Sequence, residues 1–191
     1  MLLDDGCYHL IARGNNRLFI FDVSGGFSAF LEIIKKSKEK FKWQLFHYCL
    51  LSNHFHLLGK IEKGEILPKL MQYLLFEYSR WYRKKISYIG HVWQGRYKSE
   101  LILQEGYFLE CGRYIERNPL RARMVEKIED YPWSSYCHYA YGRIDSLVDN
   151  DPYYEQLGEN LAIRTSTYRD YVCIERPYEK IVEKVLLQTY S

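Results

Sequence analysis

Hydrophobic and polar residues follow two alternating patterns along the chain, one typical of strands and one typical of helices. Period-two alternation and dense apolar or aromatic runs predict strands at residues 8–13, 43–51, 54–61 and 97–103. Apolar residues at steps of three and four predict helices at residues 27–40, 67–82 and 107–118. The last of these helices meets Pro119, where we expect it to end or bend because proline lacks the backbone N–H.

The order of these elements predicts the fold. Strand, helix, strand, strand, helix, strand is the βαββαβ pattern of a split, ferredoxin-like domain. The two middle strands are close enough in sequence to form an antiparallel hairpin. We therefore expect an α+β fold with an antiparallel sheet, helices over one sheet face, and extra C-terminal helices. We divide the chain into residues 1–142 and an acidic extension, 143–191, that is partly helical near residues 178–187.

Composition places the chain among ordinary globular proteins. Of its 191 residues, 47% are hydrophobic and 27% are charged. The five cysteines are widely spaced without a CxxC pair, which argues against a disulfide framework and a thiolate zinc site. No apolar run approaches the ~20 residues of a membrane span, and the first residues lack the basic start of a signal peptide. We expect a cytoplasmic protein.

The small overall net charge of +3 hides an uneven distribution. Residues 80–123 hold ten Lys and Arg residues against four Glu residues, a net charge of +6, with aromatic residues among them. The segment after residue 143 has a net charge of −4. Basic groups beside aromatic rings suit phosphate contact and base stacking on a single-stranded nucleic acid. The alternative interpretation is a solvated surface linked by salt bridges.

Two histidines flank one apolar residue on the third predicted strand. Because side chains alternate faces, His54 and His56 share a face while Phe55 and Leu57 point to the other. Imidazoles about 7 Å apart along a strand can share one metal ion. The other interpretation is that both are surface histidines on a half-exposed strand.

A second polar pair lies on the predicted helix before Pro119. Tyr114 and Asn118 are separated by one helical turn and so share a helix face. If that face turns toward His54 and His56, two imidazoles, an amide and a phenol converge. A metal there would act as a Lewis acid on a phosphodiester, and the phenol would be a covalent nucleophile. A free phenol has a pKa near 10, so nearby cations would have to help it lose its proton.

Five segments together resemble the REP-associated tyrosine transposases, IS200-like members of the single-tyrosine HUH transposase superfamily. They are residues 8–17, 51–58, 90–99, 113–119 and 131–136. The resemblance covers about residues 8–141 and implies that residues 1–142 form a ferredoxin-like catalytic domain. It implies cleavage and rejoining of single-stranded DNA at imperfect palindromic hairpins through a 5′-phosphotyrosine intermediate. Leu51-Ser52 replaces the usual Met-Pro of the second segment, a departure that lies outside the chemistry.

The resemblance also assigns roles by motif position. It implies that Tyr114 is the nucleophile, that His54 and His56 bind a divalent metal, Mg²⁺ or Mn²⁺, and that Asn118 lies where the superfamily often has a polar metal ligand. That ligand is commonly Gln, so Asn118 has a shorter reach. Imidazoles suit Mn²⁺ or a later metal better than Mg²⁺. We expect DNA contacts from basic and amide residues of these segments and the helix end: Arg13, Asn15, Asn16, Arg17, Arg96, Lys98, Arg113, Arg117 and Arg121.

Two other functions remain as alternatives. Ferredoxin-like sheets also serve as non-catalytic nucleic-acid-binding modules. Simple binding does not require two histidines, a tyrosine and an asparagine in this arrangement, so we favour the enzyme. A small-molecule metalloenzyme would leave the arginines around Tyr114 unexplained. We interpret the other four histidines as structural or surface residues: His9, His47, His91 and His138. We expect single-stranded or hairpin DNA as the partner and allow for a homodimer.

Overall fold

We describe the protein from a computed structural model, which places residues 2–103 and 105–174. Its strands are β1 (Gly6–Arg13), β2 (Gln44–Leu51), β3 (His54–Ile61) and β4 (Lys98–Ile102). Its helices are α1 (Gly26–Phe41), α2 (Leu67–Ile86), α3 (Glu105–Arg121), α4 (Tyr136–Tyr141), α5 (Pro152–Glu155) and α6 (Leu161–Cys173). Short 3₁₀ turns are η1 (Asn15–Arg17), η2 (Gly64–Ile66) and η3 (Ile128–Asp130). The helix expected near residues 178–187 lies outside the described residues.

The four strands form one antiparallel sheet in the order β2-β3-β1-β4. The predicted hairpin is therefore β2 and β3, and β1 lies between β3 and β4 as the ferredoxin-like topology requires. The α+β class and the antiparallel sheet expected from the sequence are confirmed. The register places His54 beside Arg13 of β1 and Leu51 of β2, because β3 begins directly at the hairpin turn.

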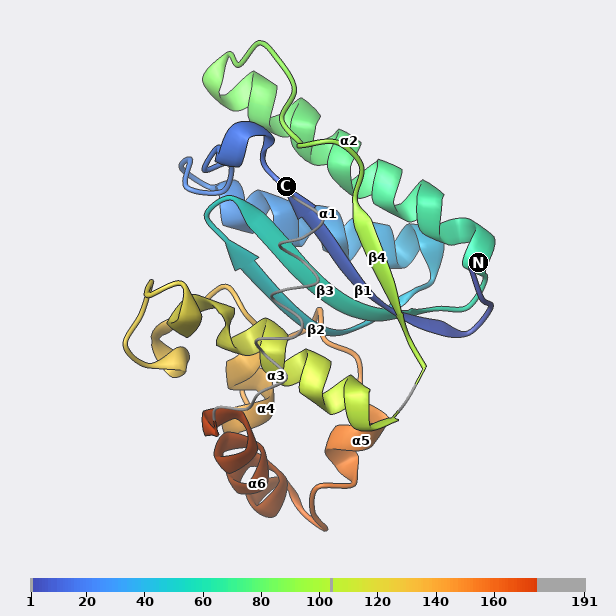
Figure 1. Ribbon diagram of the computed structural model, residues 1–191, viewed down its shortest axis with the longest axis vertical. Coiled ribbons are helices and arrows are strands. Elements are labelled where there is room, and N and C mark those ends of the chain that lie inside the picture. The colour runs from blue at the N-terminus through green and yellow to red at the C-terminus, as the bar shows by residue number, and fades with distance from the viewer. Residues whose placement is uncertain (1, 104, 175–191) are drawn as a thin grey trace.

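Helices α1 and α2 cover one face of the sheet (Figure 1). Phe30 of α1 and Leu74 of α2 pack against sheet residues such as Leu10 and Phe55, and all four side chains are fully buried. The apolar stripe of α2 predicted from its three- and four-residue steps is thus core packing.

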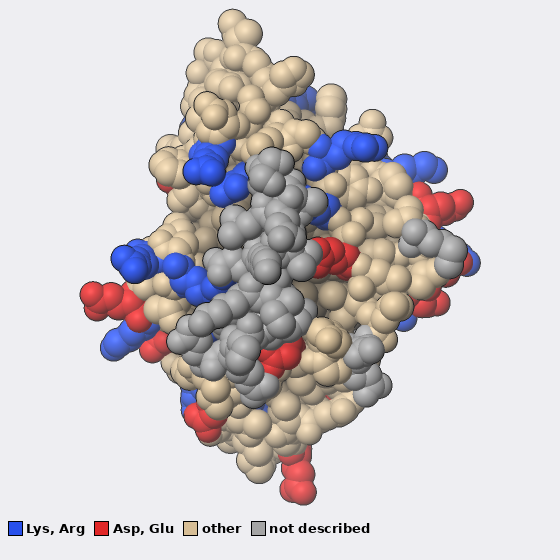
Figure 2. Space-filling model, viewed as in Figure 1, with Lys and Arg blue, Asp and Glu red and all other residues tan. Residues whose placement is uncertain are grey.

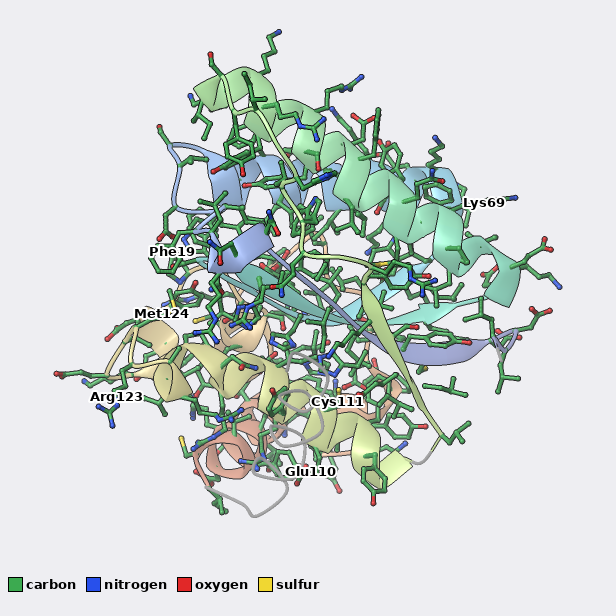
Figure 3. The ribbon with its side chains drawn as sticks, turned by 45° about the horizontal axis from the view of Figure 1, so that its top comes forward. Phe19, Lys69, Glu110, Cys111, Arg123 and Met124 are labelled. Atoms are coloured by element: carbon green, nitrogen blue, oxygen red, sulfur yellow. The ribbon has the colours of Figure 1, made fainter. Side chains whose placement is uncertain are left out.

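The expectation that helices cover one sheet face is incomplete, because α3 packs on the opposite face. Phe108 and Ile115 of α3 form a second buried cluster with Ile11, Cys49 and Leu58 of the sheet. In the stick view, Cys111 points from α3 toward the sheet, whereas Arg123 and Met124 extend outward beyond the end of α3 (Figure 3). This second layer arises because the sheet face bearing His54 and His56 also carries apolar residues that need cover.

Helix α3 does not end at Pro119, which was one of the two outcomes expected there, an end or a bend. The helix continues through Pro119 to Arg121. Proline has no N–H for the carbonyl one turn earlier, that of Ile115. The side-chain amide of Asn118 donates to this carbonyl at 3.3 Å and to the Tyr114 carbonyl at 2.8 Å. Asn118 therefore supplies a donor where the backbone lacks one.

The C-terminal helices pack beside α3 rather than on the sheet core (Figure 1). Aromatic residues of α4, α5 and α6 form a third buried cluster, which includes Tyr139, Tyr154 and Tyr168. The boundary at residue 142 stays a prediction. Within the described part of the chain, no helix has the length and apolar character needed to cross a membrane.

Candidate active site on the sheet face under α3

The two histidines of β3 lie on the sheet face that α3 covers. Phe55 and Leu57, the intervening residues, are fully buried in the opposite layer, as strand alternation predicts. The ring centres of His54 and His56 are 5.0 Å apart in an edge-on arrangement. His56 is 2% exposed and His54 is half-buried at the hairpin end of the strand.

The structure brings Tyr114 to these histidines. Phe108 and Ile115 bury one side of α3 against the sheet, which places the Tyr114 ring over His56. The ring centres of Tyr114 and His56 are 5.7 Å apart and nearly perpendicular. Tyr114 is itself 4% exposed. The phenol and the two imidazoles thus share one small space, although they are about 60 residues apart in sequence.

A third histidine, interpreted from the sequence as structural, joins this space. His9 Nε2 of β1 lies 2.9 Å from His56 Nδ1, and the two rings stack with centres 5.1 Å apart. The His9 ring also meets the edge of the Tyr114 ring at 6.0 Å. Sequence reasoning missed His9 because its place depends on the pairing of β1 with β3. Its period-two position relative to Ile11 and Arg13 was the available signal.

The surroundings keep these imidazoles neutral. Burial lowers the pKa of His9 to about 3. Burial, with a smaller effect from the Arg13 charge, lowers the pKa of His54 to about 4. Burial chiefly, and then the neighbouring histidines and the charges of Arg13 and Arg121, hold the pKa of His56 well below its ordinary value. Neutral imidazole is the form that binds metals, so His54 and His56 are in the form needed for a metal ligand near pH 7.

Two arginines bring positive charge to the same space. Arg13 pairs in register with His54, and its charge acts on both His54 and His56. The guanidinium of Arg121, in the last turn of α3, lies 4.9 Å from the centre of the Tyr114 ring. A cation over an aromatic face is attracted to it and favours negative charge developing nearby.

The side chains at this site could hold a divalent cation whose remaining ligands come from a phosphate and from water. Asn53 Oδ1 lies 2.6 Å from His54 Nδ1. An amide oxygen only accepts, so His54 carries its proton on Nδ1 and keeps the Nε2 lone pair. Asn118 uses its amide nitrogen within α3, which leaves its oxygen as the possible ligand atom. Among residues 2–103 and 105–174, no three His, Cys, Asp or Glu side chains are grouped to hold a metal. Two imidazoles therefore leave other ligand positions for an amide oxygen, phosphate oxygen and water.

The loops expected to contact DNA meet at the same end of the sheet. The N–H of Gly14 donates to the Asn53 carbonyl at 2.7 Å, and that of Asn15 donates to the Val92 carbonyl at 2.8 Å. Asn16 and Arg17 are exposed and have positive φ angles of 49° and 58°, an unfavourable conformation for non-glycine residues. These contacts hold the η1 turn beside the hairpin turn that precedes His54.

The remaining residues expected to contact DNA are divided between surface and interior. Arg96 is exposed, and Lys98 is half-buried on the face of His56. Arg113 and Arg117 are instead buried. Arg117 Nη1 donates to the Val172 carbonyl at 2.8 Å, and Arg113 donates to Glu110 at 3.1 Å and to the Ile174 carbonyl. DNA contact by Arg113 and Arg117 does not fit this arrangement, because α6 and the residue that follows it occupy their guanidinium groups.

The charge of residues 80–123 is consequently not one continuous surface. Figure 2 shows several separate groups of Lys and Arg side chains on the viewed face. The basic side chains whose charges act on His56 are Arg13 and Arg121. The local positive charge at the site therefore comes from the ends of β1 and α3.

Comparisons with known proteins show which family the chain resembles. A family model described as "Transposase IS200 like" matches residues 3–118, which include His54, His56, Tyr114 and Asn118. A Haemophilus influenzae protein described as a REP-associated tyrosine transposase is 25% identical over 117 residues. That match covers 56% of this chain and 66% of the relative, just under two thirds of its length.

The fold is also found in a solved structure. A REP-associated tyrosine transposase bound to a REP hairpin superposes with a TM-score of 0.65. The match covers 79% of this chain and 89% of that chain, at 16% sequence identity. At this identity the likeness concerns the fold, including the antiparallel sheet with its helices.

Proposed function

The chain belongs to the IS200-like transposase family, and from this we propose that it cleaves and rejoins single-stranded DNA through a covalent bond to Tyr114. The observation that carries the proposal is the Tyr114 ring 5.7 Å from His56, on a helix packed over the two-histidine strand. A nucleic-acid-binding module would not need a phenol and neutral imidazoles brought together beneath a helix.

We propose a two-step transesterification. The Tyr114 phenol loses its proton to solvent, and its oxygen attacks the phosphorus of a phosphodiester. The bond from phosphorus to the 3′ oxygen breaks, and this oxygen takes a proton and leaves as a free 3′-OH. The 5′ phosphate stays on Tyr114. In the second step a 3′-OH loses its proton and its oxygen attacks the same phosphorus. The bond from phosphorus to the Tyr114 oxygen breaks, and the phenolate takes up a proton, so a phosphodiester is kept throughout without an outside energy source.

Each side chain has a separate task in this proposal. Arg121 and Arg13 favour the negative charge of the phenolate and of the phosphate as they approach each other. His54, His56 and the Asn118 oxygen are the residues that would hold a divalent cation. When bound there, Mg²⁺ or Mn²⁺ supplies Lewis-acid polarisation of a phosphate oxygen. Because Tyr114 is 4% exposed, its phenol must become more exposed before a phosphate can reach it.

We infer that the substrate is a DNA hairpin with single-stranded flanks. The solved relative is bound to a REP hairpin, and the curated relative is described as REP-associated. The exposed η1 turn follows β1 and Arg96 precedes β4, and both offer amide and guanidinium groups to phosphates.

A cleavage assay tests this function. Wild-type protein is incubated with Mn²⁺ and a hairpin oligonucleotide carrying a label on each side of the junction between stem and flank. The proposal predicts a free 3′-OH fragment and a labelled protein–DNA band that survives denaturing electrophoresis. Tight binding of the hairpin with neither product would favour the non-catalytic binding module instead.

A further inference from the structure

His9 connects the two halves of the site, although neither family resemblance nor sequence pattern assigned it a role. On β1 it lies diagonally across from His56, because β1 Ile11 pairs with His56 and His9 pairs with Leu58. Its Nε2 lies 2.9 Å from His56 Nδ1. Its ring stacks on His56 and also touches the edge of Tyr114. His56 and Tyr114 also contact each other through their rings, whose centres are 5.7 Å apart.

The short nitrogen-to-nitrogen contact restricts the proton positions. Two ring nitrogens 2.9 Å apart form a hydrogen bond only if one donates and the other accepts. If His56 Nδ1 accepts, its proton is on Nε2, and neither nitrogen is left to bind a cation. If His56 Nδ1 donates, the Nε2 lone pair remains for a metal. Histidine ligands commonly donate their second N–H to a nearby acceptor, which fixes the ring and the tautomer.

Burial makes this partner hard to replace. His9 and His56 are each 2% exposed, so solvent does not easily supply another acceptor for His56 Nδ1. The half-buried His54 has its own partner, Asn53 Oδ1 at 2.6 Å. Each of the two candidate ligands thus has one side-chain contact at Nδ1, and His9 is the partner of the more buried one.

We propose that His9 is a positioning residue that accepts the Nδ1 proton of His56, so that His56 presents Nε2 to a divalent cation beside Tyr114. This inference rests on the proposed function only in assigning the metal to His54 and His56. His9 sets the direction of the His56 ring and keeps Tyr114 in contact with both rings, without itself binding the metal or the DNA.

Two substitutions separate this role from simple packing. His9→Phe keeps a ring of similar size but removes the acceptor. His9→Gln places an amide oxygen near the former Nε2 position and can accept the same proton. His138→Gln is the matched control, since His138 lies on α4 and contacts Tyr139 rather than the site. Mn²⁺ binding to the full chain is measured by calorimetry without DNA, and folding is checked by circular dichroism.

The proposal predicts that His9→Phe weakens Mn²⁺ binding about ten- to a hundredfold, as loss of such a partner typically does, while His9→Gln stays within about threefold. His138→Gln should bind as wild type. Equal binding by wild type and His9→Phe, or equal loss in His9→Phe and His9→Gln, would overturn it.

A metal-free measurement keeps the inference separate from the proposed function. Long-range ¹H–¹⁵N spectra of wild-type protein with labelled histidine report which nitrogen of His56 holds the proton, with His56→Ala used for assignment. A proton on Nδ1 supports the proposal, and a proton on Nε2 overturns it even if Mn²⁺ binds. Wild type that fails to bind Mn²⁺, or His56→Ala that binds it normally, would instead refute the metal site, while the tautomer still decides the role of His9. If His9→Phe does not fold, His9→Gln and this spectrum decide the question.

Discussion

His47 Nδ1 lies 2.9 Å from Glu116 Oε1, so strand β2 and the helix that carries Tyr114 are joined by a fully buried ion pair. The other ring nitrogen of His47 lies 3.2 Å from Asp151 Oδ2. Glu116 also accepts a hydrogen bond from the Tyr168 hydroxyl of α6 at 2.7 Å. This network fixes α3 between the sheet and the C-terminal helices, two residues away from Tyr114.

Removing the charged imidazole of His47 from this network should destabilise the protein. His47→Ala leaves the Glu116 and Asp151 carboxylates buried without their shared partner, and we expect a loss of about 3–5 kcal/mol in the free energy of unfolding. Urea denaturation measures it. Lys63→Ala is the control, because the Lys63–Asp4 pair is exposed and screened by solvent, so its loss should change stability little. Equal effects of the two substitutions would show that the buried network does not stabilise α3.

The same network should make stability depend on pH. Burial alone would lower the pKa of His47, but hydrogen bonds and charge from Asp151 and Glu116 outweigh it and raise the pKa to about 9. The unfolded value is near 6.5, so this contribution is fully present below pH 6.5 and is lost as pH rises toward about 9. The urea midpoint should fall across that interval in wild type. His47→Phe should lack this alkaline decrease, and a decrease of the same size in both proteins would assign it to other groups.

DNA binding should weaken with salt through the exposed arginines near the hairpin end of β3. Replacing Arg17 or Arg96 by Ala should reduce the slope of log affinity against log salt by up to about one unit each. Lys69 is the control, since Figure 3 places it at the opposite end of the molecule from Phe19, which follows the η1 turn. Fluorescence anisotropy with a labelled hairpin gives these slopes. A slope changed by Lys69→Ala but not by Arg17→Ala or Arg96→Ala would place the DNA elsewhere.

Binding and chemistry should separate at the histidines. His54→Ala and His56→Ala should each abolish cleavage while hairpin affinity changes little, because metal polarisation belongs to the chemical step. Excess EDTA should have the same effect on wild type. His138→Ala should cleave normally. Normal cleavage in excess EDTA would show that the reaction does not need a metal ion.

The fold, and the face on which each candidate residue lies, could be anticipated because they depend on local periods, whereas the meeting of the histidines with Tyr114 depends on how α3 packs on the sheet. Strand alternation predicted that His54 and His56 share one face of their strand. The helical step predicted that Tyr114 and Asn118 share one face of their helix. The continuation of α3 through Pro119 could not be anticipated, because it is compensated by a side-chain donor from Asn118.

Two other features depend on partners distant in sequence. His9 reaches His56 only through the register of β1 and β3, and its period-two position predicts its face of the strand but not its partner. The sequence suggests that Arg113 and Arg117 are surface charges. Both guanidinium groups are instead buried, and they donate to carbonyls of α6 and of the residue after it. Charge counting along the sequence cannot distinguish a basic residue facing solvent from one occupied inside the protein.

The central claim is that Tyr114 becomes covalently joined to DNA. Tyr107, on the same helix, is the rival nucleophile and is 46% exposed, whereas Tyr114 is buried beside His56. Incubating wild-type protein with Mn²⁺ and hairpin DNA, digesting both, and mapping the remaining nucleotide by peptide mass spectrometry distinguishes them. We predict a phosphotyrosyl adduct on Tyr114, which Tyr114→Phe lacks while it folds and binds hairpin normally. An adduct on Tyr107, or strand cleavage by Tyr114→Phe, would contradict the account.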